Sequence, residues 1–141
     1  MSAGRAGDQA PAALADTSVF IARESGRRLE GLPGRIAVSV VTVGELQLGV
    51  LLAADRQTRA LRGATLDLAR RSDPIPLTEA IMEDWAAIAQ ACMTSGAGKL
   101  VRTFDALIAA TALVHGLPVV TQDNDFDQIR AAEPRLDVIR V

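Results

Sequence analysis

The sequence contains very few cysteine, histidine, lysine and aromatic side chains. Among its 141 residues are one Cys, one Trp, three Phe, no Tyr and one His. A single cysteine, Cys92, excludes an internal disulfide framework and predicts a reducing, cytoplasmic location. So few aromatic rings argue against a platform that stacks single-stranded bases. The one histidine, His115, stands where a helix is expected to end, so no Ser-His-Asp triad is expected.

Long apolar runs and an excess of basic charge are also missing. No window reaches the roughly 18 uncharged apolar residues that a membrane-spanning helix requires, so no membrane association is expected. The first 13 residues lack the apolar segment of a secretory signal, which argues against export. Fifteen basic residues stand against 17 acidic ones, giving a formal net charge of −2. Bulk charge therefore gives no indication of nucleic-acid binding.

The remaining composition is that of a globular protein, with 49% apolar and 23% charged residues. Residues 1–12 are small and polar and predict a flexible tail, which leaves 13–141 as a single domain. Short apolar strands separated by helices predict an α/β fold with a mostly parallel central sheet. Strands are predicted at 13–15, 36–41, 119–121 and 136–141, with a short edge strand at 75–77. Helices are predicted at 19–24, 42–54, 56–71, 78–95 and 103–115, with a helical turn at 126–131.

Acidic residues follow three of the predicted strands. Asp16 follows the first strand, Glu45 the second, and Asp123 and Asp125 the third. Asp105 lies in the first turn of the apolar helix at 103–115. Ligands of open α/β sheets bind beyond the carboxyl ends of the strands, so we expect these acids to meet there.

Each acid taken alone also has an ordinary structural interpretation. Asp16 can cap a helix, Thr42 and Glu45 have the spacing of a capping box, and Asp105 suits a helix N-terminus. Together, however, the acids lie in the most apolar stretches of the chain, with no Lys or Arg inside those stretches. Clustered carboxylates there stay partly protonated unless a cation lies between them, and Mg²⁺, with Mn²⁺ as a substitute, is the hard ion that oxygen ligands prefer. Such a site suits hydrolysis of phosphodiester bonds.

Four segments then resemble the PIN domain family and, within it, the VapC toxins. They read ADTSVFIA, VTVGELQLGV, TFDALIAATA and VVTQDNDFDQI, and the resemblance covers about 14–141. It implies a three-layer α/β/α domain and a Mg²⁺-dependent endoribonuclease that is the toxin of a type II toxin–antitoxin pair. Asp16, Glu45 and Asp105 match the family's first three acids, and the fourth falls on Asp123, which we favour, or Asp125. The resemblance implies that the catalytic residues are Asp16, Glu45, Asp105 and Asp123. The metal ligands that it implies are Asp16, Asp105, Asp123 and Asp125. Ser18 and Thr121 match the hydroxyls that support the site in this family.

The resemblance also implies partners. VapC-like proteins form homodimers and bind a VapB-type antitoxin, whose C-terminal segment lies across the acidic site. For the RNA substrate, the basic residues nearest the predicted site are the expected phosphate contacts: Arg27, Arg28, Lys99 and Arg102. The arginines of 56–71 are interpreted as a solvated helix face.

Two other functions stay open at this point. One is a PIN-like RNA-binding or regulatory module without activity, although all four acidic positions are filled. The other is an aspartyl-phosphate domain of the receiver or phosphatase type, which also places an Asp after its first strand. That chemistry needs a cation beside Asp16, and the only lysine is Lys99.

Overall fold

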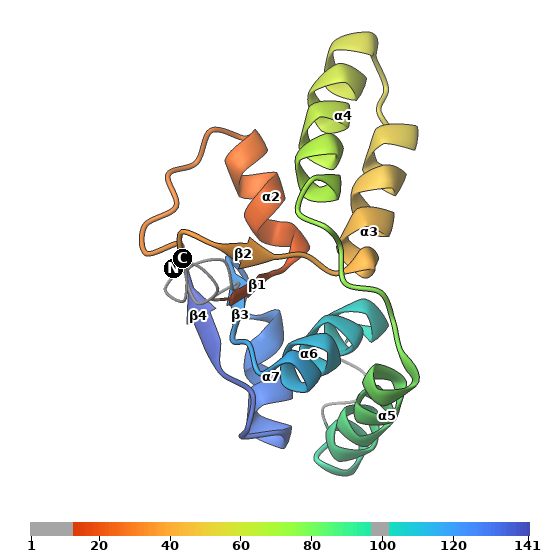
Figure 1. The fold of residues 1–141 in the computed structure, drawn as a ribbon, viewed down its shortest axis with the longest axis vertical. Helices are drawn as coiled ribbons and strands as arrows, with labels where there is room; N and C mark the ends of the chain where they lie inside the picture. The colour runs from red at the N-terminus through yellow and green to blue at the C-terminus, as the bar shows by residue number, and fades with distance from the viewer. Residues whose placement is uncertain (1–12, 97–101) are drawn as a thin grey trace, which may run out of the picture.

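The computed structural model describes residues 13–96 and 102–141 and contains a four-stranded sheet flanked by helices (Figure 1). The strands are β1 (Ala13–Ala15), β2 (Ile36–Ala37), β3 (Val119–Thr121) and β4 (Val138–Arg140). The helices are α2 (Thr17–Glu24), α3 (Val40–Leu51), α4 (Arg56–Arg70), α5 (Glu79–Thr94), α6 (Thr103–His115) and α7 (Asp125–Ala132).

All four strands are parallel, in the order β2-β1-β3-β4. Leu14 of β1 is in register with Ala37 on one side and with Val119 on the other. The chain runs outward from β1 to β2 and then returns past β1 to form β3. The strand order therefore reverses between β1 and β3, and the carboxyl ends of these two strands are the position at which open α/β sheets bind their ligands.

Side chains that alternate along the strands build two separate cores, one on each face of the sheet. Leu14 and Val119 belong to the core beneath α5, α6 and α7, whereas Ala13, Ala15 and Val120 belong to the core beneath α2, α3 and α4. Figure 1 shows the two groups of helices on opposite sides of the strands. The two-residue period of a strand thus produces the predicted three-layer α/β/α arrangement.

Local signals of the C-terminal half predict its elements closely. Helix α6 and strand β3 have the predicted bounds. Gly116 ends α6 in the left-handed conformation, with φ at 65°, which a glycine adopts without steric cost. The predicted turn at 126–131 is the helix α7, and the predicted final strand is shortened to β4.

The prediction of a strand over 36–41 is wrong beyond Ala37. The Ser39 hydroxyl accepts a hydrogen bond from the backbone N–H of Val41 at 3.0 Å, so Ser39 caps a helix that begins at Val40. The predicted capping box is wrong for the same reason, because Thr42 and Glu45 lie inside α3 and Ser39 is its cap. A favourable cap has here outweighed the strand propensity of a β-branched run.

Two further expectations need adjustment. The predicted edge strand at 75–77 is reduced to a single parallel bridge between Ser39 and Ile75. The predicted tail at 1–12 lies outside the described residues. Within the described segments, no helix combines the length and the apolar character needed to cross a bilayer.

Candidate active site

Asp16 lies directly after β1 and is almost fully buried, with 4% of its surface exposed. It is the N-cap of α2, and its Oδ1 accepts a hydrogen bond from the backbone N–H of Ser18. Its Oδ2 accepts a hydrogen bond of 2.6 Å from the hydroxyl of Thr121, the last residue of β3. Burial raises the pKa of Asp16, and these hydrogen bonds work in the opposite direction. Both oxygens of this carboxylate are thus satisfied inside the protein.

The two predicted supporting hydroxyls do lie beside Asp16. The Oγ atoms of Ser18 and Thr121 are 3.3 Å apart. The backbone N–H of Gln122 donates to Ser18 Oγ at 2.9 Å, and that of Asp123 donates to Thr121 Oγ1 at 3.0 Å. This network joins the start of α2 to the turn after β3, and it fixes the backbone of Asp123 next to Asp16.

Glu45 reaches the site from α3, and protein donors occupy both of its oxygens. Oε1 accepts a hydrogen bond of 2.7 Å from the hydroxyl of Thr17, which in turn lies 3.2 Å from the hydroxyl of buried Thr42. Oε2 lies 3.2 Å from Nη2 of Arg102, forming an ion pair. The Glu45 side chain is 16% exposed and the Arg102 side chain 62% exposed. A carboxylate from α3 and a guanidinium from the residue before α6 therefore meet at this edge.

Asp105 differs from the other buried acid because one of its oxygens is left without a partner. It is 7% exposed, and Oδ2 is completely buried with no hydrogen-bond partner in the described part of the chain. Burial raises the pKa of Asp105 to about 6, while nearby Arg102 lowers it and the charges of Asp125, Asp16 and Glu45 raise it. An unsatisfied buried carboxylate oxygen is costly, and it is the kind of atom that a cation would satisfy.

Asp123 and Asp125 affect the pKa values of different members of the cluster. Both side chains are exposed. The charge of Asp123 raises the pKa of Asp16, whereas the charge of Asp125, at the start of α7, raises the pKa of Asp105. The two acids that follow β3 therefore each add to the negative charge around one of the two buried carboxylates.

These acids meet at one edge of the sheet, but they do not form a finished metal site. Within 13–96 and 102–141, no three acidic, His or Cys side chains are gathered closely enough to hold an ion. The donors are nevertheless all carboxylate oxygens, and the free oxygen of Asp105 is among them. This donor set suits a hard divalent cation such as Mg²⁺.

The basic residues predicted to contact RNA phosphates differ in their positions. Arg102 contacts Glu45, and Arg27 donates a hydrogen bond of 2.9 Å to the side chain of Gln122, next to the Thr121 network. Arg28 is exposed after α2, and no ion pair or hydrogen bond joins it to the site within the described segments. Lys99 lies outside the described residues.

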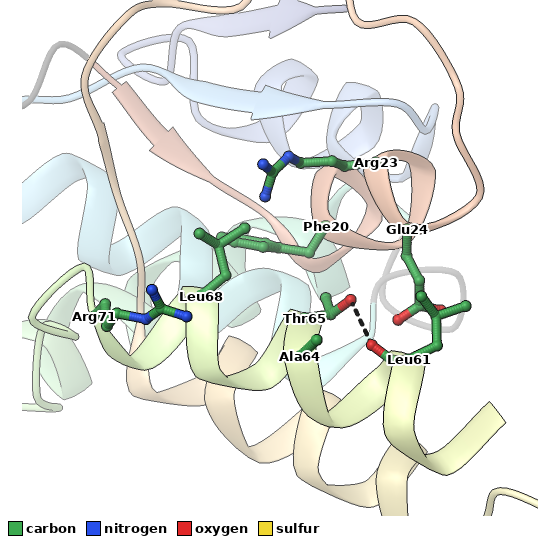
Figure 2. Close-up of a pocket in the computed structure, with 8 residues that line it drawn as sticks. All are labelled: Phe20, Arg23, Glu24, Leu61, Ala64, Thr65, Leu68 and Arg71. Carbon is green, nitrogen blue, oxygen red and sulfur yellow. Dashed lines mark hydrogen bonds between the residues drawn. The ribbon is translucent and has the colours of Figure 1, made fainter. Parts of the chain in front are cut away.

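Two hollows lie beside α2, and one of them is bordered by an acid of the site. The smaller, of about 200 Å³, is bounded by Glu45 together with residues of α2, α3 and α4: Ile21, Glu24, Leu46, Gly49 and Arg62. The larger, of about 420 Å³, runs between α2 and α4 and contains none of the candidate acids (Figure 2). Its wall combines apolar and charged side chains: Phe20, Arg23, Glu24, Leu61, Ala64, Thr65, Leu68 and Arg71. Glu45 thus borders an open, solvent-accessible space.

The sequence prediction missed Thr17 and Thr42 as participants in the site. The sequence pattern suggests only a capping box for Thr42 and no role for Thr17. A hydroxyl directly after the first acid, in the first turn of α2, could have suggested the role of Thr17. Nothing local could have paired it with Glu45, which is 28 residues away.

Comparison with known proteins gives relatives that match nearly the whole fold. Ribonuclease VapC8 of Mycobacterium tuberculosis is 54% identical over 99 residues, which are 70% of this chain and 88% of that protein. Ribonuclease VapC4 of the same species is 45% identical over 135 residues, covering 92% of this chain and 96% of the relative.

Solved structures agree with the sequence relatives. The VapBC-5 toxin–antitoxin structure of M. tuberculosis has a chain that is 39% identical, with a TM-score of 0.82, and the match covers 93% of this chain and all of that one. FitAcB of Neisseria gonorrhoeae matches at 28% identity and a TM-score of 0.67, over 89% of this chain and 95% of that one. The family model of the PIN domain matches residues 13–132. The chain belongs to the PIN domain family, and its similarity to named relatives places it in the VapC branch.

Proposed function

We propose that this chain is a Mg²⁺-dependent endoribonuclease, with Mn²⁺ as a substitute ion, and the toxin of a type II toxin–antitoxin pair. The proposal is supported by the positions of Asp16, Glu45 and Asp105, which lie together at the carboxyl ends of β1 and β3. One buried oxygen of Asp105 has no protein partner there in the described segments. The family and the relatives named as VapC ribonucleases support the same activity.

In this proposal Asp16, Asp105 and the acids of the turn after β3, Asp123 and Asp125, hold the metal. A bound divalent ion would polarise a phosphoryl oxygen and lower the pKa of a water molecule that attacks phosphorus. Ser18 and Thr121 keep Asp16 in place, and Thr17 keeps Glu45 in place. Glu45 borders a hollow of about 200 Å³, which suits it to orient the attacking water or accept its proton.

Partners follow from the same relatives. Several similar solved structures are toxin–antitoxin complexes, including one from M. tuberculosis and one from Klebsiella pneumoniae. We infer that this chain also binds a VapB-type antitoxin, which closes the acidic site with a basic side chain, and that the toxin is a homodimer in the cytoplasm. An acidic pocket attracts a cationic group from a partner for the same electrostatic reason that it attracts a metal ion.

The test compares purified wild-type protein with the Asp16→Asn variant. We expect the wild type to cut RNA with Mg²⁺ or Mn²⁺ and to lose that activity in EDTA. The Asn side chain still caps α2, but the loss of a ligand charge should lower cleavage by about 100-fold to 1,000-fold. The matched control is Asp67→Asn, which removes an exposed charge on α4 and should leave cleavage unchanged.

The same experiment separates this function from the two alternatives. A wild-type protein that binds RNA but never cuts it, with any divalent ion, would support the inactive regulatory module. Labelling of Asp16 by acetyl phosphate would support the aspartyl-phosphate domain instead. Cleavage by Asp16→Asn at the wild-type rate, with both proteins equally folded by circular dichroism, would falsify the assigned site.

A further inference from the structure

Arg102 is the one cation of the described residues that contacts an acid of the site. Its Nη2 lies 3.2 Å from Oε2 of Glu45, and its charge also lowers the pKa of Asp105. Arg102 precedes α6 without capping it through its side chain, so the helix does not depend on this guanidinium for a hydrogen bond. The guanidinium therefore compensates two acids that are proposed to serve the metal site.

The two donors that hold Glu45 differ in how readily they can leave. Thr17 is part of α2, donates at 2.7 Å and is itself in contact with buried Thr42. Arg102 makes one longer contact and leaves 62% of its side chain exposed. An exposed, single ion pair is weak and is easily exchanged for water or for another cation. If either donor leaves Glu45, it should be Arg102.

We propose that Arg102 is an internal counter-cation, which holds Glu45 in the metal-free protein and competes with the divalent ion for the acid cluster. When an ion compensates the acids, the guanidinium is released toward solvent at the mouth of the site. There it can bind a substrate phosphate. Arg102 is thus a positioning residue for Glu45 before it is a phosphate contact. This inference rests on the proposed function, because it assumes that the acid cluster binds a divalent ion.

The test is the affinity of the protein for Mg²⁺ and Mn²⁺, measured by calorimetry without RNA at pH 8, where Asp105 is ionised. We expect Arg102→Ala to bind both ions about threefold to tenfold more tightly, because a nearby positive charge is removed. Arg102→Lys keeps the charge and should stay within about twofold of the wild type. The matched control, Arg56→Ala, removes an exposed arginine at the start of α4 and should change nothing.

A second pair of variants separates competition for Glu45 from a general effect of charge. In a Glu45→Gln background the ion pair is already gone, so Arg102→Ala should tighten ion binding less than it does in the wild type. An equal gain in both backgrounds would overturn competition for Glu45. Unchanged or weaker ion binding by Arg102→Ala would overturn the counter-cation role altogether.

The outcomes also separate this inference from the proposed function. A protein that binds Mg²⁺ as predicted but cuts no RNA would contradict the nuclease and leave the role of Arg102 intact. An active nuclease whose ion affinity is indifferent to Arg102 would contradict only the present inference.

Discussion

The two buried acids of the site, Asp16 and Asp105, differ in the hydrogen bonds that their carboxylate oxygens accept. Asp16 has a donor on each oxygen, one from the backbone of Ser18 and one from the hydroxyl of Thr121. Asp105 is also buried, yet its Oδ2 has no partner among the described residues. Burial raises the pKa of both carboxyls. The comparison indicates that the fold alone satisfies the carboxylate of Asp16, whereas Oδ2 of Asp105 is left open for the cation that we propose.

Removing the Thr121 hydroxyl should have the largest effect on stability and metal affinity, because it removes one of the two donors that hold Asp16. Thr121→Val leaves Asp16 Oδ2 without its donor, so we expect a loss of about 1–3 kcal/mol in the free energy of unfolding. Metal affinity should fall about 10-fold to 100-fold, as is usual when the partner of a ligand is lost. Urea unfolding and calorimetry measure the two effects.

The control for this variant is Thr111→Val in α6. Thr111 is also fully buried, but it donates to the carbonyl of Leu107 within its own helix, at 2.8 Å, and touches no acid of the site. It should lose stability without a specific loss of metal affinity. Equal metal affinity in the two variants would contradict the role assigned to Thr121.

Neutralising Asp105 should stabilise the metal-free protein. The folded pKa of about 6 lies above the ordinary value of 3.8, so ionised Asp105 opposes folding above pH 6 and has no such effect below about pH 4. We expect Asp105→Asn to raise the free energy of unfolding by about 2 kcal/mol at pH 7.5. The gain should shrink between pH 6 and pH 4. A variant less stable than the wild type at pH 7.5 would contradict the unfavourable effect that we assign to the buried charge of Asp105.

The same pKa predicts how metal binding depends on pH. Ligands bind a metal in their deprotonated form, so protons compete with the ion for Asp105 below pH 6. We expect the Kd for Mg²⁺ to rise by up to about tenfold per pH unit as pH falls from 6 to 5, and to level off above pH 7. Calorimetry across this range checks it, and an affinity that is flat from pH 5 to pH 8 would exclude Asp105 as a ligand.

The acids of the turn after β3 should have smaller and distinguishable effects. The charge of Asp123 raises the pKa of Asp16, and the charge of Asp125 raises the pKa of Asp105. Asp125→Asn should therefore lower the pKa of Asp105, and Asp123→Asn should leave it unchanged, as followed by NMR titration in the absence of metal. Whichever variant weakens Mg²⁺ binding more identifies the fourth acid. The assignment of the two acids to separate partners fails if both variants shift Asp105 equally.

The sequence predicted those elements whose signals are local. Gly116 ends α6, and Pro118, which cannot continue a helix, precedes β3. Both elements have the predicted bounds. At Ser39 two local preferences conflict, because β-branched residues favour a strand while a serine favours a cap. The cap determined the outcome, and the predicted strand was therefore too long.

The site was predictable as a set of acids but not as a set of contacts. The rule for parallel sheets places Asp16 and the turn after β3 at one edge, and the structure shows them there. The pairing of Glu45 with Thr17 and Arg102 depends on how α3 packs between distant segments, 28 and 57 residues away. Such contacts leave no periodic or local signal in one sequence. The metal-ligand roles themselves stay predictions.

The order of the strands has a consequence for the synthesis of the protein. Asp16 and the Thr121 hydroxyl that holds it are separated by 105 residues, and β3 is made after β1, β2 and five helices. A nascent chain that stops short of β3 has its first acid but neither the strand nor the turn that brings the other acids to it. The acid cluster can therefore form only after the chain has been made through the turn that follows β3.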